Sequence, residues 1–316
     1  MMNECYSFLR NSYYYVKPIV PRRLQLGIRR WVILRERPKH SKVWPIDEGA
    51  GKPPAGWSGW PERKQFALVL THDVETAKGQ ERCTRLADLE NDLGFRSSFN
   101  FVAEGYRVSS ALRKDLIDVG FEVGIHGITH RGNPFRSKKV FQEQAVKIND
   151  YLRDWECVGF RCPSMYHNLD WIGKLNVDYD ASTFDTDPFE PQPEGVGTIF
   201  PFWISGDSSR KGYVELPYTL PQDHTLFILM GEKGTDIWRR KLNWIAKCGG
   251  MALLNVHPDY MNFDERKNNL GEFSAEYYVD FLRFIKDKYE GQYWHVLPKE
   301  MARFWVENVQ GNKGNG

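Results

Sequence analysis

The sequence predicts an α/β fold in which parallel strands alternate with crossover helices. Two observations support this prediction. Short apolar or β-branched segments alternate with helical patterns along most of the chain, which is the order of repeated βα units. The polar residues that could carry chemistry end these strand-like segments, where parallel α/β folds build their sites. The strand–helix order fits a barrel or a wound sheet, and the placement of the polar residues favours a barrel.

The predicted elements begin after residue 65. The strand-like segments are 66–71, 96–102, 121–125, 158–161, 177–183, 213–216, 251–256 and 293–296. The helix-like stretches between most of them are 80–93, 110–119, 137–155, 236–248 and 274–289. We find no internal sequence repeat.

Composition and length bound the class of protein. The 316 residues allow one large domain, and 41% hydrophobic residues without any apolar run of about 18 residues exclude a membrane span. The N-terminus lacks the pattern of a secretory signal. Five scattered cysteines, an odd number without a Cys-x-x-Cys pair, fit free thiols. We therefore expect a cytoplasmic protein.

A basic segment lies near the N-terminus. Residues 17–42 hold nine Lys/Arg against one acid, a local net charge of +8 that leaves −6 for the rest of the chain. Pro21 could open a helix there, whose apolar positions would be Leu24, Ile28, Trp31 and Val32. Such a helix could lie on an anionic membrane, bind an acidic partner, or pack Leu24 and Trp31 onto the main domain. The acidic remainder gives no support for nucleic-acid binding.

The segment that follows is rich in Pro, Gly and Trp. Residues 43–60 therefore predict a linker or an entry loop. We expect an N-terminal extension over residues 1–60 and a barrel domain over residues 61–310.

Two carboxylates end the first strand-like segment. Side chains alternate in an extended chain, so Asp73 and Glu75 would share one face while His72 and Val74 share the other. One carboxylate could hold a metal ion and the other could act as the general base of a hydrolysis. The alternative is that Thr71 or Asp73 only caps the next helix.

Two histidines follow another strand-like segment. His126 and His130 are four residues apart, and on one helical turn this spacing would point both imidazoles the same way. Two His and one carboxylate form a catalytic zinc set that leaves a position open for water. Together with Asp73 and Glu75, the pair indicates a metal-dependent hydrolase.

The order of these motifs resembles the polysaccharide deacetylase family, the chitooligosaccharide-deacetylase-like carbohydrate esterases. The segments that carry the resemblance are Thr71-His-Asp-Val-Glu75, His126-Gly-Ile-Thr-His130, Arg161-Cys-Pro163 and Asn255-Val-His257. The resemblance implies a distorted (β/α)7-8 barrel and metal-dependent removal of an acetyl group from an N-acetylated sugar or polysaccharide intermediate.

The resemblance also implies the roles of individual residues. Asp73 would be the general base, His126 and His130 would bind one divalent metal, most simply Zn²⁺, and Arg161 would orient the base. His257 would be the general acid. The family's acid that tunes this histidine has no clean match here; of Asp180 and Asp185, we expect Asp180.

Three positions depart from the family pattern. The residue after the base is Val74, which cannot bind a metal, so we expect Glu75 to supply the third ligand. His72 replaces an aromatic residue and should pack or hydrogen bond on the opposite face. Asn255 stands where Leu is usual.

The sequence leaves the substrate open. Residues 185–193 are too rich in proline for a helix and predict a long loop over the strand ends. The same metal set could cleave another non-peptide C–N bond in a small amide or imide. A barrel that binds sugar without hydrolysing it is the third possibility.

Overall fold

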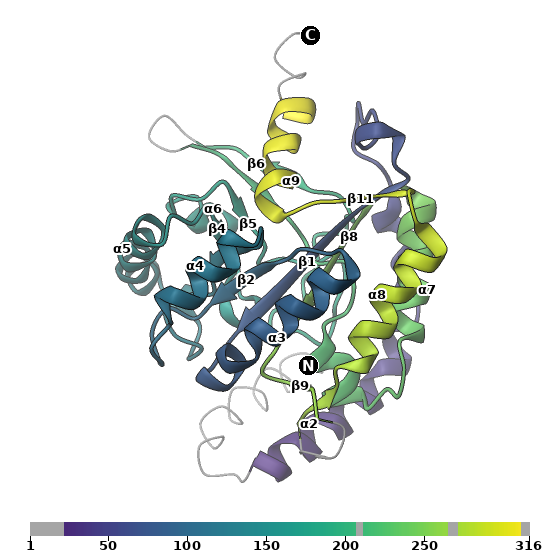
Figure 1. Cartoon of the computed structure of the whole chain (residues 1–316), viewed down its shortest axis with the longest axis horizontal. Helices are drawn as coiled ribbons and strands as arrows, with labels where there is room; N and C mark the ends of the chain where they lie inside the picture. The colour runs from purple at the N-terminus through teal and green to yellow at the C-terminus, as the bar shows by residue number, and fades with distance from the viewer. Residues whose placement is uncertain (1–21, 207–210, 265–270, 311–316) are drawn as a thin grey trace, which may run out of the picture.

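The computed structural model describes residues 22–206, 211–264 and 271–310 (Figure 1). Within these ranges, eight of the strands lie in one path of a curled sheet, in the order β11-β1-β2-β3-β4-β5-β7-β6, and β8 pairs with β1. The strands are β1 (Phe66–Val74), β2 (Ser98–Phe101), β3 (Glu122–Ile125), β4 (Gly159–Phe160), β5 (Tyr179–Asp180), β6 (Phe202–Ile204), β7 (Tyr213–Glu215), β8 (Met251–Val256) and β11 (Tyr293–His295). A separate small pair is β9 (Met261–Asn262) and β10 (Phe273–Ser274).

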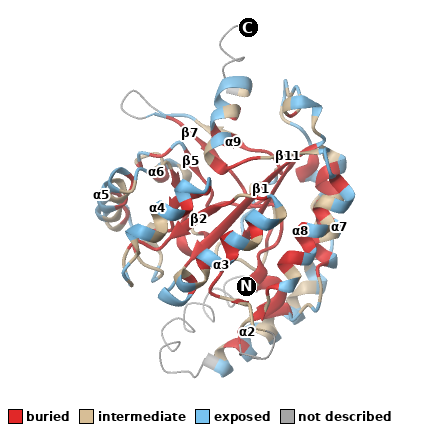
Figure 2. Cartoon of the chain, viewed as in Figure 1, coloured by how far each residue is buried: buried red, intermediate tan, exposed pale blue. Residues whose placement is uncertain are grey.

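The helices lie outside the sheet, and Figure 2 shows that the strands are buried while the outer sides of the helices are exposed. The α-helices are α2 (Arg22–Glu36), α3 (Ala77–Leu93), α4 (Ser110–Asp118), α5 (Lys138–Asp154), α6 (Leu169–Ile172), α7 (Asp236–Cys248), α8 (Glu276–Tyr289) and α9 (Pro298–Trp305). A π-helix, η6 (His224–Met230), follows β7. The alternation of parallel strands with these helices confirms the predicted α/β class.

Strand β1 lies at the centre of the sheet because both of its edges are paired. One edge pairs with β8 from Ala67 to His72. The other edge pairs first with β11, through residues 66–68, and then with β2, through residues 71–74. All nine residues of β1 are buried, as expected for a strand covered on both faces.

The barrel closes through an irregular segment after β7. Tyr218 forms a parallel bridge with Phe184, and Leu220 forms one with Leu254 of β8. The backbone N–H of Leu220 donates to the carbonyl of Leu253 at 3.1 Å. The sheet is therefore a distorted barrel, as the sequence predicted.

Most element predictions are confirmed, including α7 and β8 at the predicted residues. The sequence patterns did not predict η6, α9 and the antiparallel strand β6. The stretch 185–193 contains no helix or strand, as its prolines predicted.

The predicted basic helix exists as α2, but its orientation differs from one of the alternatives. Leu26 and Ile33 are buried against the main domain, whereas Leu24 is 56% exposed and Trp31 is 61% exposed. The interpretation in which Leu24 and Trp31 pack onto the domain is therefore wrong. Residues 17–21 of the basic segment lie outside the described residues.

Residues 44–60 pack onto the barrel. Trp44 and Trp60 are buried, and the indole N–H of Trp60 donates to the carbonyl of Gly249 at 2.8 Å. Trp57 stacks on Trp305 of α9 with 5.3 Å between ring centroids. Aromatic burial of this kind joins the segment to the end of the chain.

Across the described parts of the chain, every helix is too short or too polar to span a bilayer. The four cysteines found there, Cys83, Cys157, Cys162 and Cys248, are unpaired. Cys5 lies outside the described residues.

Candidate active site

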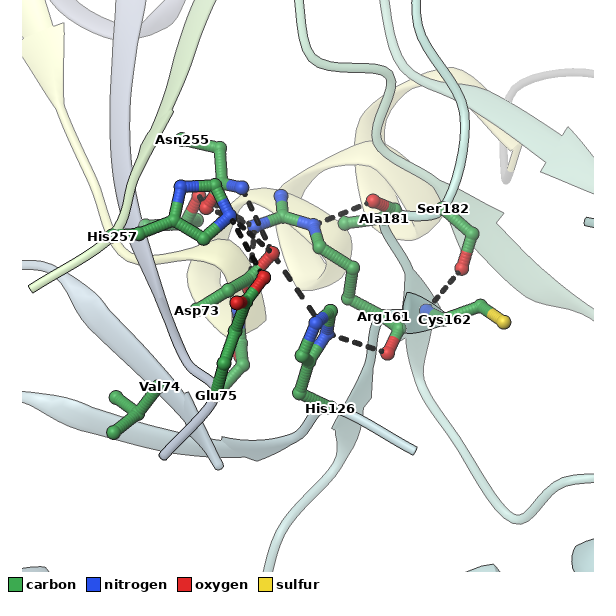
Figure 3. Close-up of polar contacts among 12 residues, drawn as sticks. Asp73, Val74, Glu75, His126, Arg161, Cys162, Ala181, Ser182, Asn255 and His257 are labelled. Carbon is green, nitrogen blue, oxygen red and sulfur yellow. Dashed lines mark hydrogen bonds and ion pairs between the residues drawn. The ribbon is translucent and has the colours of Figure 1, made fainter. Parts of the chain in front are cut away.

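Four strands bring the predicted site residues to one end of the barrel (Figure 3). Strand β1 carries Asp73, with Glu75 directly after it, and β8 is followed by His257. His126 follows β3 and Arg161 follows β4. Because these strands are parallel, their C-terminal ends meet at the same rim, which places the polar residues together.

Asp73 is held by three side-chain donors. Its Oδ1 accepts from Asn100 Nδ2 at 3.1 Å and from Arg161 Nη1 at 3.2 Å, and its Oδ2 accepts from Asn255 Nδ2 at 2.8 Å. Burial raises the pKa of Asp73, but the positive charges of Arg161 and His257 outweigh it, so the pKa is lowered. Asp73 is therefore an oriented, ionised carboxylate, as a general base requires.

Arg161 is buried, and its guanidinium hydrogen bonds to three further groups besides Asp73. Its Nη1 also donates to Thr71 Oγ1 at 2.8 Å and to Asn255 Oδ1 at 2.7 Å, while its Nε donates to the carbonyl of Ala181 at 2.7 Å. Asn255 thus connects Arg161 to Asp73, and its polar side chain at the position where Leu is usual has a structural reason.

Glu75 lies with the two histidines. One ligand atom from each of Glu75, His126 and His130 lies within 4.8 Å of the other two. His130 Nε2 is 2.9 Å from Glu75 Oε1, and the hydroxyl of Tyr260 donates to Glu75 Oε2 at 2.8 Å. The N-cap of α3 is Thr76, so the alternative in which Thr71 or Asp73 caps the next helix is wrong.

The histidine pair meets through a loop, and the expected helical turn is wrong. Residues 126–133 contain no helix, and the two rings lie 5.5 Å apart between centroids. Gly127 has φ +66°, and a Cβ at this position would lie 2.6 Å from Pro163 Cδ. The left-handed turn that only glycine can make against Pro163 therefore folds His130 back toward His126.

The state of His126 fits a metal ligand. Its Nδ1 is 3.1 Å from the carbonyl of Arg161, which fixes this nitrogen as the donor. Its Nε2 is buried without a hydrogen-bond partner among the described residues. Burial lowers the pKa of His126 to about 4, so the imidazole is neutral at neutral pH. A buried nitrogen lone pair beside Glu75 and His130 is the arrangement that a divalent ion would complete.

His257 faces both carboxylates. Its Nε2 is 3.9 Å from Asp73 Oδ2 and 3.8 Å from Glu75 Oε1 (Figure 3). Its Nδ1 is 2.7 Å from Asp223 Oδ1. Burial lowers the pKa of His257, but the carboxylates of Asp223, Glu75 and Asp73 raise it to about 10. The ring is therefore held in a proton-donating state.

The expectation that Asp180 lies against His257 is wrong. Asp180 accepts a hydrogen bond from Ser182 Oγ at 2.7 Å and lies opposite Glu215 in the sheet. Burial raises the pKa of Asp180. The other candidate, Asp185, pairs with Lys241 Nζ at 2.6 Å.

His72 lies on the opposite face of β1, as alternation predicted. Its Nε2 is 2.8 Å from Glu90 Oε1, and Ser97 and Tyr278 also donate to this carboxylate. His72 is therefore a hydrogen-bonding residue between β1 and α3.

Several residues of the site were not predicted from the sequence, namely Asn100, Asp223, Asp259 and Tyr260. Asp259 accepts from the backbone N–H of Glu75 at 2.9 Å and from Thr76 Oγ1 at 2.5 Å. Asp259 and Tyr260 lie only two and three residues after His257, and this proximity in the sequence could have marked them. Asp223 and Asn100 have no comparable signal in the sequence.

The chain was compared with known proteins. No protein-family model matches it, and a search of curated proteins finds no similar sequence. Solved structures do match. A protein of Mycobacterium smegmatis assigned as a polysaccharide deacetylase is 18% identical, with a TM-score of 0.60 over 83% of this chain and 96% of its own.

Two further structures are similar at the same level. Puue allantoinase is 15% identical, with a TM-score of 0.58 over 79% of this chain and 93% of its own. A Pseudomonas aeruginosa protein assigned as a polysaccharide deacetylase is 14% identical, with a TM-score of 0.57 over 79% and 94%. The chain therefore has the fold of the polysaccharide deacetylases, and the resemblance predicted from its motifs is confirmed at the level of the fold.

Proposed function

We propose that this protein is a metal-dependent hydrolase that removes the acetyl group from an N-acetylated sugar or polysaccharide precursor. The observation that carries the proposal is the position of His257, whose Nε2 faces Asp73 and Glu75 at 3.9 and 3.8 Å. An acid and a base thus face each other beside a candidate metal-binding set, as hydrolysis of an amide requires.

Glu75, His126 and His130 would hold the ion, and Zn²⁺ suits this donor set. When bound, such an ion would polarise the acetamide carbonyl and lower the pKa of a water molecule. Tyr260 and Asp259 would keep Glu75 in place through its side chain and backbone. Outer hydrogen bonds of this kind orient metal ligands.

The protons would move between two residues of the chain. Asp73, fixed by Asn100, Arg161 and Asn255, takes the proton of the attacking water. His257, oriented by Asp223, gives a proton to the departing amine. The C–N bond breaks, and acetate and a free amino sugar are released.

A second candidate is hydrolysis of a small cyclic amide. The similarity in fold to an allantoinase supports it, since the same proton transfers would open a ring C–N bond. A barrel that binds sugar without hydrolysis is the third candidate. It gives no reason for Asp73 to be held by three donors, so we place it last.

Acetate release tests the proposal. Wild type should release acetate from acetylated chitooligosaccharides, while Asp73→Asn and His257→Ala should each lower the turnover number by about 100-fold or more. Glu143→Gln, an exposed change on α5, is the matched control. Hydrolysis of allantoin without acetate release would favour the second candidate, and oligosaccharide binding without turnover would favour the third.

We place the reaction in the cytoplasm. The four unpaired cysteines support a reducing compartment. A sugar intermediate attached to a lipid would be an accessible substrate there.

A further inference from the structure

Helix α2 exposes an apolar stripe that the barrel does not cover. Leu24, Ile28, Trp31 and Leu34 are 56%, 42%, 61% and 51% exposed. They recur at intervals of three or four residues, so they lie on one face of the helix. Large apolar side chains gathered on one exposed face indicate an interaction surface.

Arginines border this stripe. Arg23 and Arg29 are exposed and fall on its two sides. The guanidinium of Arg35 lies over the Trp31 ring, 5.4 Å from its centroid. The only acid of α2, Glu36, pairs with Lys39 at 2.7 Å. Among the described residues, the surface therefore combines a tryptophan, aliphatic side chains and exposed arginines.

The opposite side of α2 is fixed to the barrel. Leu26 and Ile33 are buried, and Arg30 Nε donates to the carbonyl of Ile228 in η6 at 2.7 Å. Just after the helix, Arg37 pairs with Glu232 at 2.5 Å. These contacts leave the apolar stripe facing outward, because the helix cannot turn over without losing them.

The helix lies close to the candidate active site. It packs on η6, which begins directly after Asp223, the partner of His257. Burial and Asp187 raise the pKa of Glu190, while both Arg29 and His257 lower it. Glu190 thus lies within electrostatic range of both the helix and the site.

We propose that the apolar stripe of α2 docks the protein onto an anionic lipid bilayer and holds the candidate active site next to the lipid surface. Tryptophan and aliphatic side chains enter the interface, while arginines keep their charged ends at the lipid phosphates. A second copy of the chain is disfavoured as the occupant, because two such faces would bring like charges together. This docking does not depend on the proposed hydrolysis.

Vesicle co-sedimentation of the full chain tests the proposal. Wild type should sediment with vesicles containing phosphatidylglycerol and much less with pure phosphatidylcholine, and added salt should weaken binding. Leu24→Glu combined with Trp31→Glu should lower the bound fraction about tenfold or more. Val119→Glu combined with Val146→Glu, two exposed positions elsewhere with the same added charge, should bind as wild type does.

A second double variant tests the proposal even if the Leu24/Trp31 variant fails to fold. Arg23→Gln with Arg29→Gln alters exposed side chains only and should selectively weaken binding to anionic vesicles. Equal sedimentation of wild type with both vesicle types would overturn the proposal, as would unchanged binding of the Leu24/Trp31 variant. A wild-type dimer in solution that this variant dissociates would assign the face to a second copy instead.

Discussion

Asp223 contacts His257 through both of its carboxylate oxygens. Its Oδ1 lies 2.7 Å from the imidazole Nδ1, and its Oδ2 accepts the backbone N–H of the same residue at 2.8 Å. One carboxylate therefore sets both the position of the backbone and the orientation of the ring.

This contact predicts a large effect of Asp223→Asn. The loss of the carboxylate should lower the pKa of His257, so the alkaline limb of the pH–rate profile should move to lower pH. The turnover number should fall by about 100-fold. Steady-state kinetics across pH measure both effects.

Asp180→Asn is the matched control for this prediction, because Asp180 is equally buried but does not contact His257. Its pH–rate profile should keep the wild-type alkaline limb. The same shift in both variants would mean that Asp223 has no special relation to the histidine.

Metal content should separate Glu75 from Asp73. Glu75→Gln removes a charged donor beside His126 and His130, so the bound metal should fall well below one ion per chain. Asp73→Asn should retain the metal while losing turnover. Plasma mass spectrometry of the purified variants measures the content, and metal loss in both variants would place Asp73 among the ligands.

Asn255→Leu introduces the residue that is usual at this position in the polysaccharide deacetylase family, yet it should lower both activity and stability here. The change leaves Asp73 without its 2.8 Å donor and Arg161 without its 2.7 Å acceptor. Buried groups that lose a partner cost about 1–3 kcal/mol each. The turnover number should fall about tenfold or more and the melting temperature should drop.

Leu253→Met is a suitable control for Asn255→Leu, because it changes a buried apolar side chain of the same strand with little loss of volume. If Asn255→Leu retained wild-type turnover, the hydrogen bonds of Asn255 would not position the base.

Glu122 should make stability depend on pH. Burial raises the pKa of its carboxyl from 4.5 to about 7, although the backbone N–H of Lys299 and the hydroxyl of Tyr179 donate to it. The folded protein therefore holds this proton more tightly than the unfolded chain, and the stabilising contribution is lost as pH rises from 4.5 through 7. Across this range the contribution of Glu122 to the free energy of unfolding should fall by on the order of 3 kcal/mol.

Glu122→Gln removes this titration. Its stability relative to wild type should therefore increase as pH rises across the same range, as urea unfolding at several pH values would show. The exposed change Glu143→Gln should give a constant difference. If the stability difference between Glu122→Gln and wild type were also independent of pH, the Glu122 carboxyl would titrate normally in the folded wild-type protein.

The sequence predicted the strands that supply Asp73, His126, Arg161 and His257, because each strand is a local apolar run that ends in polar residues. The partner of His257 could not be predicted in the same way. Asp223 reaches the histidine only because the irregular segment near Leu220 closes the barrel onto β8. No local pattern encodes that closure, so the sequence favours the strand-end residue Asp180 instead.

Periodicity predicted the basic helix but not which of its sides faces the domain. Leu24, Ile28 and Trp31 form one apolar set, and Leu26 with Ile33, seven residues apart, forms another. The spacing alone does not decide which set faces the domain. Contacts with Ile228 and Glu232, about 200 residues away, decide it.

Strands β1 and β8 pair directly up to the site, with Thr71 opposite Asn255 and His72 opposite Val256. The proposed base and acid follow on these two neighbouring strands. Their spacing is therefore a property of the backbone ladder, and it cannot widen without breaking the centre of the sheet. A larger or differently shaped substrate would have to be accommodated by the surrounding loops, so the range of substrates could change in evolution while the distance between proton donor and acceptor stays constant.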